Sequence, residues 1–263
     1  MPDLDDAYAN GAYIEGAEAY PPRWAQEAAD FRAQLGARAR LDVSYGPSDR
    51  MALDYFSPEG TAKGTLIFVH GGYWLKFDRT YWSHFAAGAL AKGWAVAMPS
   101  YDLCPSVRIA GITQQIAQAV MQVADDSTGP ISLAGHSAGG HLVARMLAPG
   151  MLPASVLKRL SYVAPMSPLS DLEPFLRTSM NAEFRMDTAM ARAESPVHQP
   201  APDVPVSVWV GAGERPAFLD QAHWLADAWG CGHVIVPDKH HFNIIDALKD
   251  PSSDMIQRLT TAR

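Results

Sequence analysis

The stretch Ile131–Ala148 reads ISLAGHSAGGHLVARMLA, and the rest of the chain is organised around it. Ile131–Ala134 is a short, mainly apolar run that predicts a strand, and Gly139–Ala148 places apolar residues on one face of a predicted helix. Between them lies Gly135-His136-Ser137-Ala138-Gly139, a G-x-S-x-G sequence at a strand-to-helix turn. A serine on so tight a turn has a strained backbone and an outward-facing hydroxyl, and the glycines let neighbouring backbone approach. The pattern predicts a nucleophilic Ser137, with a plain glycine-rich turn as the alternative.

The composition argues against several classes of function. The 263 residues are 48% hydrophobic and 19% charged, which is ordinary for a soluble globular protein. The formal net charge is -7 and the basic residues form no cluster, so we expect neither nucleic acid nor a membrane as partner. Cys104 and Cys231 lie far apart and the N-terminus has no apolar leader, so a cytoplasmic location is expected. There is no G-x-G-x-x-G after the first buried strand, no P-loop lysine and no H-E-x-x-H, so we expect no cofactor and no metal.

Apolar runs alternate with amphipathic segments along most of the chain. The expected strands are Leu41–Tyr45, Met51–Phe56, Thr65–Val69, Trp94–Met98, Ile131–Ala134, Leu160–Ala164, Val206–Val210 and His233–Val236. The expected helices are Trp24–Leu35, Tyr81–Ala91, Ile112–Val123, Gly139–Ala148, Phe218–Trp229 and a last one that Ser252 caps.

This alternation predicts an α/β fold with a mostly parallel sheet, an N-terminal antiparallel hairpin and helices on both faces. We expect residues 1–263 to form a single domain. Residues 1–40 form an N-terminal arm that packs on the domain or overhangs its site, and the proline-rich residues 165–205 form a lid-like insertion. Ligands bind at the carboxyl ends of the strands in such sheets, which is where Ser137 and two histidine-containing segments lie.

A serine hydroxyl needs a base, an acid that orients the base, and N–H donors for the oxyanion. His241 follows the last strand and is the expected base, with the adjacent His240 as its rival. Glu214 lies on a small-residue turn after Val206–Val210 and is the expected acid.

Two other carboxylates remain open as the acid. Asp220 lies in the first turn of a helix, where the helix dipole alone would favour it, and Asp171 follows the strand before Glu214. The ordinary role of Asp171 would be to cap the helix that begins at Leu172. Asp238 is too close in sequence to His241 to approach it from behind.

The sequence His70-Gly71-Gly72-Tyr73-Trp74 directly follows the buried strand Thr65–Val69. Gly71 and Gly72 have unhindered N–H groups, so we expect them to form the oxyanion hole with the N–H of Ala138. The expected substrate-contacting residues flank these motifs and are Tyr73, Trp74, His136 and Phe242.

Together these motifs resemble the α/β-hydrolase fold, and more narrowly its kynurenine formamidase (arylformamidase) branch, which is related to carboxylesterases. The narrower resemblance rests on HGGYW at His70–Trp74, YDLCPSVRIAGITQQ at Tyr101–Gln115, SPLSDL at Ser167–Leu172 and GAGERPAFLDQ at Gly211–Gln221. One departure is Glu214, where many members of the branch have aspartate.

The resemblance implies a serine hydrolase that removes a small acyl group from an aromatic amide or ester, with N-formylkynurenine as the leading candidate. Tyr73 and Trp74 would wall an aromatic pocket and the 165–205 insertion would cover it. The alternatives are a short-chain carboxylesterase and a non-catalytic binding protein on the same fold. The oligomeric state is left open, with a homodimer as one alternative.

Overall fold

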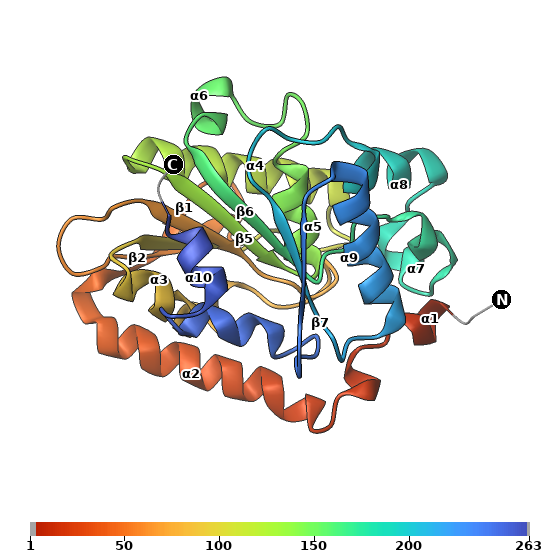
Figure 1. Cartoon of the computed structure of the whole chain (residues 1–263), viewed down its shortest axis with the longest axis horizontal. Coiled ribbons are helices and arrows are strands. Elements are labelled where there is room, and N and C mark those ends of the chain that lie inside the picture. The colour runs from red at the N-terminus through yellow and green to blue at the C-terminus, as the bar shows by residue number, and fades with distance from the viewer. Residues whose placement is uncertain (1–3, 262–263) are drawn as a thin grey trace.

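The computed structural model describes residues 4–261 and is built on one eight-stranded sheet (Figure 1). The strands run in the spatial order β1-β2-β4-β3-β5-β6-β7-β8. Their bounds are β1 Ala39–Ser44, β2 Ala52–Phe56, β3 Thr65–Val69, β4 Ala95–Pro99, β5 Ile131–His136, β6 Leu160–Met166, β7 Ser207–Gly211 and β8 Gly232–Val236. β1 pairs antiparallel with β2 and β2 antiparallel with β4, whereas all later pairs are parallel. The predicted hairpin and mostly parallel sheet are confirmed.

Helices cover both faces of the sheet, as predicted. Their bounds are α1 Leu4–Ala7, α2 Tyr20–Leu35, α3 Ala87–Ala91, α4 Ile109–Asp126, α5 Ala138–Arg145, α6 Ala154–Leu157, α7 Asn181–Phe184, α8 Thr188–Glu194, α9 Pro216–Trp229 and α10 Asp254–Leu259. Helices α2, α3 and α10 enclose one apolar core, and α4, α5 and α9 enclose the other. Within residues 4–261, none of the helices combines the length and apolarity that a membrane crossing requires.

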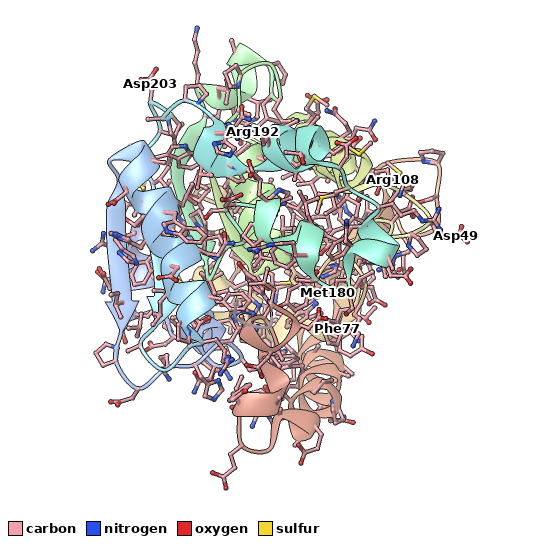
Figure 2. All side chains as sticks on the ribbon, turned by 90° about the vertical axis from the view of Figure 1, so that its right-hand side faces the viewer. Asp49, Phe77, Arg108, Met180, Arg192 and Asp203 are labelled. Carbon is pink, nitrogen blue, oxygen red and sulfur yellow. The ribbon has the colours of Figure 1, made fainter. Side chains whose placement is uncertain are left out.

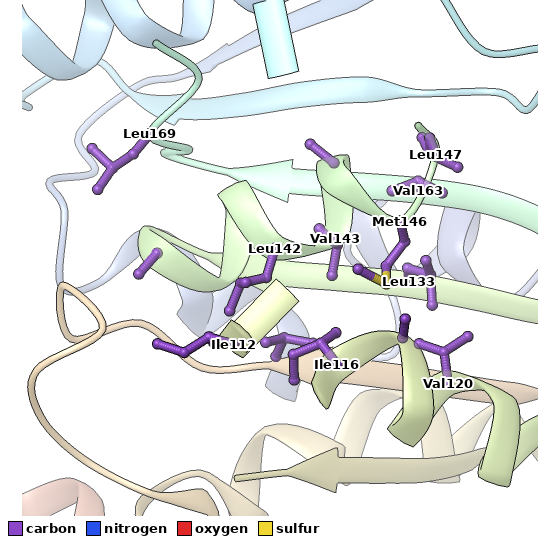
Figure 3. Packing of buried hydrophobic residues seen from close by; sticks show 14 of the residues in the cluster. Ile112, Ile116, Val120, Leu133, Leu142, Val143, Met146, Leu147, Val163 and Leu169 are labelled. Atoms are coloured by element: carbon purple, nitrogen blue, oxygen red, sulfur yellow. The ribbon is translucent and has the colours of Figure 1, made fainter. Parts of the chain in front are cut away.

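The apolar face of α5 fixes the position of the turn that precedes it. Leu142, Val143 and Met146 are fully buried and pack with Leu133 of β5 and Ile116 of α4 (Figure 3). Burying each such side chain contributes about 1.5–3 kcal/mol relative to leaving it exposed. Packing against β5 and α4 therefore fixes the start of α5. Ser137, which directly precedes α5, is fixed with it.

The predicted continuous helix Tyr81–Ala91 is wrong. The segment is broken into two 3₁₀ turns, Arg79–Tyr81 and Ser83–Ala86, followed by the short α3. Asp78 caps the first turn by accepting a hydrogen bond from the N–H of Thr80 at 2.8 Å, and Trp82 leaves the helical backbone at φ -120°, ψ -2°. The bulky Trp82 side chain is buried, so tertiary packing overrides the local helical pattern.

The helix predicted in the N-terminal arm exists but begins earlier, at Tyr20, with Pro21 and Pro22 in its first turn. The residues before it reach the carboxyl edge of the sheet. Tyr8 is buried there, where its carbonyl accepts a hydrogen bond from the hydroxyl of Tyr73 at 2.6 Å and its hydroxyl accepts one from Gln221 at 2.9 Å. The arm is thus attached to the loop that follows β3.

Residues 167–205 fold as short helices and loops at the same edge of the sheet, whereas Pro165 and Met166, which the prediction placed in the insertion, belong to β6. They include α7 and α8 and the 3₁₀ turns Glu173–Arg177 and Pro196–His198. In Figure 2 this insertion lies above the arm, with Met180 of the insertion close to Phe77 of the loop after β3.

Buried polar contacts attach the insertion to α4 and α5. The carboxylate of Glu194, at the end of α8, accepts hydrogen bonds from Thr113 at 2.7 Å and from Arg145 at 3.2 Å. The Glu194 carbonyl is 2.8 Å from Nε2 of His141, which must donate because a carbonyl can only accept. A buried charge stays stable only when it is paired in this way, so these contacts favour a fixed insertion.

The His141 contact predicts a pH effect on stability. Burial lowers the pKa of His141 to about 4 in the folded chain, against about 6.5 when unfolded. Between these values the unfolded chain binds a proton that the folded chain does not, so His141 costs stability as the pH falls from about 6.5 to about 4.

We therefore expect His141→Gln to flatten the dependence of the unfolding free energy on pH in this range by up to about 1.4 kcal/mol per pH unit. Glutamine keeps an N–H donor for Glu194 but does not titrate. Urea denaturation at pH 4.5, 5.5, 6.5 and 7.5 measures the effect. An identical slope in both proteins would contradict a neutral His141.

Candidate active site

The turn between β5 and α5 has the strained geometry expected of a nucleophilic serine. Ser137 adopts φ 57°, ψ -116°, and its N–H donates to the carbonyl of Met166 on the neighbouring strand at 2.8 Å. Neither flanking glycine could carry a side chain. A Cβ on Gly135 would lie 2.1 Å from the Gly139 carbonyl, and one on Gly139 would lie 2.0 Å from the carbonyl of Val69. The glycines are therefore required by close backbone approach.

Ser137 is the N-cap residue of α5, so the first N–H groups of that helix, beginning with Ala138, adjoin it. The first N–H groups of any helix have no carbonyl partner within the helix. They also lie at the positive end of the helix dipole. The arrangement can stabilise negative charge that develops next to the serine oxygen.

The loop after β3 passes against Ser137. A Cβ on Gly71 would lie 3.0 Å from the Cβ of Ser137 and 2.8 Å from the carbonyl of His136. Gly72 has φ 113°, and a Cβ there would lie 2.5 Å from the carbonyl of Lys76. The predicted oxyanion glycines are thus brought next to the serine, in a loop that only glycine fits.

His241 and Glu214 form a buried pair on the other side of the site. Nδ1 of His241 is 2.7 Å from Oε2 of Glu214, and the Glu214 side chain is completely inaccessible to solvent. The other oxygen, Oε1, accepts hydrogen bonds from the Ser167 hydroxyl at 2.5 Å and the Gly211 N–H at 2.9 Å. A carboxylate that accepts from all three groups is held in one orientation.

The rival residues lie in other surroundings. Asp220 is exposed on α9, and Asp171 accepts a hydrogen bond from the N–H of Glu173 at 2.9 Å, which is its ordinary capping role. His240 is 3.2 Å from the hydroxyl of Tyr20 through Nε2, and its Nδ1 accepts from the N–H of Phe242 at 3.1 Å. Neither nitrogen of His240 is directed at Glu214.

His136 supports the loop that carries His241. Its Nε2 is 2.8 Å from the carbonyl of His241, so Nε2 carries the hydrogen and donates. Complete burial, together with the nearby His241, places the pKa of His136 well below its usual value and keeps the ring neutral. The Phe218 ring packs against His241 at 4.3 Å between centroids, which further restricts the imidazole.

Ser137 and His241 lie on the wall of a cavity of about 670 Å³. The arm, the loop after β3 and the insertion all contribute to its wall. The aromatic residues that line it are Tyr8, Trp24, Tyr73, Phe77, Trp82 and Phe242. Of the residues predicted to contact substrate, Tyr73, His136 and Phe242 lie on this cavity.

The prediction for Trp74 is wrong. Its side chain is fully buried in the core, edge-on to His141 at 5.1 Å and to Phe184 at 5.5 Å between ring centroids. Tyr73 and Trp74 both have positive φ, at 54° and 57°. The loop therefore turns so that Tyr73 faces the cavity and Trp74 packs beneath the insertion.

The sequence reasoning missed several residues that complete the site. Ser167 binds the Glu214 carboxylate, whereas the sequence marks it only as the first residue of the SPLSDL segment. Tyr8 and Trp24 reach the cavity from the arm, more than 100 positions before Ser137. Nothing in their local sequence indicates this.

One cluster of possible metal ligands lies outside the cavity. Donor atoms of Asp171, Glu173 and His198 lie within 4.8 Å of one another in the described part of the chain. Glu173 already pairs with Arg192 at 2.9 Å, and His198 is exposed, so the cluster has an ordinary explanation as surface ion pairing.

Residues 66–226 match the sequence model of a family described by the alpha/beta hydrolase fold. Kynurenine formamidase of Salmo salar is 29% identical over 245 residues, which cover 87% of this chain and 83% of that protein. The kynurenine formamidase of Danio rerio is 25% identical, with 83% and 80% covered.

Two solved structures are also similar. A protein of Silicibacter sp. tm1040, described as a candidate thioesterase, has a TM-score of 0.97 and 62% identity, with 99% of this chain and 100% of that chain covered. Esterase B of Lactobacillus rhamnosis has a TM-score of 0.67 at 18% identity, with 91% and 90% covered, and shares the fold.

Proposed function

Because the chain belongs to the α/β hydrolase fold family and is a hydrolase of ester or amide substrates, we propose that Ser137, His241 and Glu214 are its catalytic triad. The observation that carries the proposal is the buried 2.7 Å contact between His241 Nδ1 and Glu214, beside a serine in a strained turn. Because Nδ1 donates to the carboxylate, Nε2 is left as the basic nitrogen for Ser137.

In the first half of the reaction, the oxygen of Ser137 attacks the substrate carbonyl carbon while Nε2 of His241 takes the hydroxyl proton. The carbonyl oxygen becomes an oxyanion, which accepts hydrogen bonds from backbone N–H groups of Gly71, Gly72 and Ala138. When the intermediate collapses, His241 gives the proton to the leaving nitrogen or oxygen, and the acyl group stays on Ser137.

In the second half, a water molecule gives a proton to His241 and attacks the acyl carbon. Collapse of this intermediate breaks the bond to Ser137, which recovers its proton, and releases the acid. Glu214 stays ionised throughout and stabilises the imidazolium that forms twice in the cycle.

Ser137→Ala tests this mechanism directly. We expect kcat for p-nitrophenyl acetate to fall by about three or more orders of magnitude, because no nucleophile remains. Equal rates for wild type and variant would exclude catalysis by Ser137.

Glu214→Gln tests the acid. Glutamine has the same shape as glutamate but carries no charge, so it cannot accept the charge-assisted hydrogen bond from His241. We therefore expect kcat to fall by about two to four orders of magnitude. Asp220→Asn and Asp171→Asn serve as matched controls and should each cost about tenfold or less. If either control lost more activity than Glu214→Gln, the acid would have to be reassigned.

We propose that the substrate is an aromatic amide with a small acyl group, and specifically N-formylkynurenine. The cavity supports this, because aromatic side chains surround the serine. The names of the relatives from Salmo salar and Danio rerio support it as well. Exposed Lys76 and Glu18 lie on the wall of the cavity, and their charges complement the carboxylate and ammonium of a free amino-acid group.

We expect Lys76→Met to raise KM for N-formylkynurenine about fivefold, the effect of losing one exposed ion pair, with little change in kcat. KM for ortho-formamidoacetophenone, which lacks the amino-acid group, should not change. Lys158→Met, an exposed lysine that does not line the cavity, is the control. An equal rise in KM for both substrates would show that Lys76 does not recognise the amino-acid group.

The alternative function is that of a short-chain esterase. Thioesters are included among its candidate substrates because the 62% identical structure is described as a candidate thioesterase. Values of kcat/KM for N-formylkynurenine, p-nitrophenyl acetate and phenyl thioacetate decide between these functions. A formamide cleaved orders of magnitude more slowly than either ester would exclude the formamidase assignment and leave the triad in place.

A further inference from the structure

His70 lies immediately before the oxyanion glycines, yet it does not line the cavity. It is completely buried, and its ring is nearly parallel to those of Tyr101, at 4.4 Å and 11°, and Trp82, at 6.2 Å and 8°. The Tyr101 hydroxyl donates to the His70 carbonyl at 2.9 Å. Both the ring and the backbone of His70 are therefore fixed by their neighbours.

The contact that His70 makes with the next residue defines its tautomer. Nδ1 of His70 is 2.7 Å from the carbonyl oxygen of Gly71, which can only accept. Nδ1 therefore carries the hydrogen, and Nε2 is left as a buried lone pair without a partner among residues 4–261. Burial lowers the pKa of His70 to about 4, so the ring stays neutral and keeps this tautomer at ordinary pH.

This hydrogen bond acts on a peptide group that the proposed mechanism uses. A trans peptide is planar, with its C=O and N–H pointing in opposite directions. Holding the Gly71 carbonyl towards His70 therefore turns the N–H of Gly72 away from it. The next carbonyl, that of Gly72, is also held, because it accepts from the N–H groups of Leu75 at 2.9 Å and Lys76 at 3.0 Å.

From these contacts we propose that His70 is a positioning residue: its Nδ1–H fixes the peptide between Gly71 and Gly72 so that the Gly72 N–H faces the oxyanion. The proposal rests on the proposed function, since it assigns a purpose to the orientation of one oxyanion donor. It gives His70 a role that does not require it to touch substrate or to exchange a proton during the reaction.

The test compares His70→Leu, which removes the donor and keeps a branched side chain, with His70→Asn, whose Nδ2–H lies at the same distance along the side chain as Nδ1–H. His84→Leu is the matched control, because His84 is also buried, its pKa is also lowered to about 4 by burial, and it does not line the cavity. Removing one oxyanion donor costs about 10²–10³ in kcat, and misdirecting it should cost less.

For p-nitrophenyl acetate we expect His70→Leu to lower kcat about 10- to 100-fold with KM within about twofold, and His70→Asn to recover most of the loss. Inhibition by benzyl trifluoromethyl ketone should weaken by the same factor. In that adduct, the Ser137 oxygen bonds to the ketone carbon, its proton passes to His241, and the ketone oxygen becomes an oxyanion. His84→Leu should leave both measurements unchanged.

The outcomes separate the two proposals. If Ser137→Ala abolishes activity but His70→Leu keeps wild-type kcat and inhibitor affinity, the role of His70 is wrong and the serine mechanism stands. If His70→Asn is as impaired as His70→Leu, the donor is not what matters and the role is also wrong. If activity does not depend on Ser137, the proposed function fails.

Imidazole ¹⁵N spectra test the tautomer without any activity. We expect a resonance pair with protonated Nδ1 and unprotonated Nε2 that does not change between pH 5.5 and 8.5 and is absent in His70→Asn. Protonation on Nε2, or titration within this range, would overturn the inference.

Discussion

The close approach of the turn at Ser137 to the ends of its neighbouring strands is the constraint on which the site depends. A single added carbon at Gly139 would lie 2.0 Å from the carbonyl of Val69, and one at Gly71 would lie 3.0 Å from Ser137 itself. The carboxyl ends of β3 and β5 can meet so closely only because these positions are glycine. The packed apolar face of α5 holds the strained turn in place, so the conformation of Ser137 is stabilised by the core rather than by its own sequence.

Around this turn, uncharged histidines orient backbone groups, and hydrogen bonds hold the buried side chain of Glu214. His70 and His136 both donate to carbonyl groups and are kept neutral by burial. The carboxylate of Glu214 accepts hydrogen bonds from three donors. A buried charge without a partner would be costly at this depth. Neutral donors therefore fix the loops around the turn.

Two segments that are not part of the sheet contribute to the wall of the cavity. The arm contributes Tyr8 and Trp24, and the insertion contributes Met180. Each is attached to the core by buried contacts, Tyr8 through Gln221 and the insertion through Glu194 and its partners. The turn at Ser137 and the shape of the space above it therefore have separate origins.

The sequence by itself determined the alternation of strands with helices and the turn at Ser137, because these depend on local patterns of apolar residues and glycines. It also favoured Glu214 over Asp220 and Asp171, because a small-residue loop gives a carboxylate more reach than a helix does. Only the tertiary structure decided which side chains surround the turn at Ser137 and the Glu214 side chain. The burial of Trp74 follows from positive φ angles in its loop, and the hydrogen bond from Ser167 to Glu214 follows from the pairing of β6 with β7. The arm reaches the cavity through contacts between residues more than 60 positions apart, which no local pattern encodes.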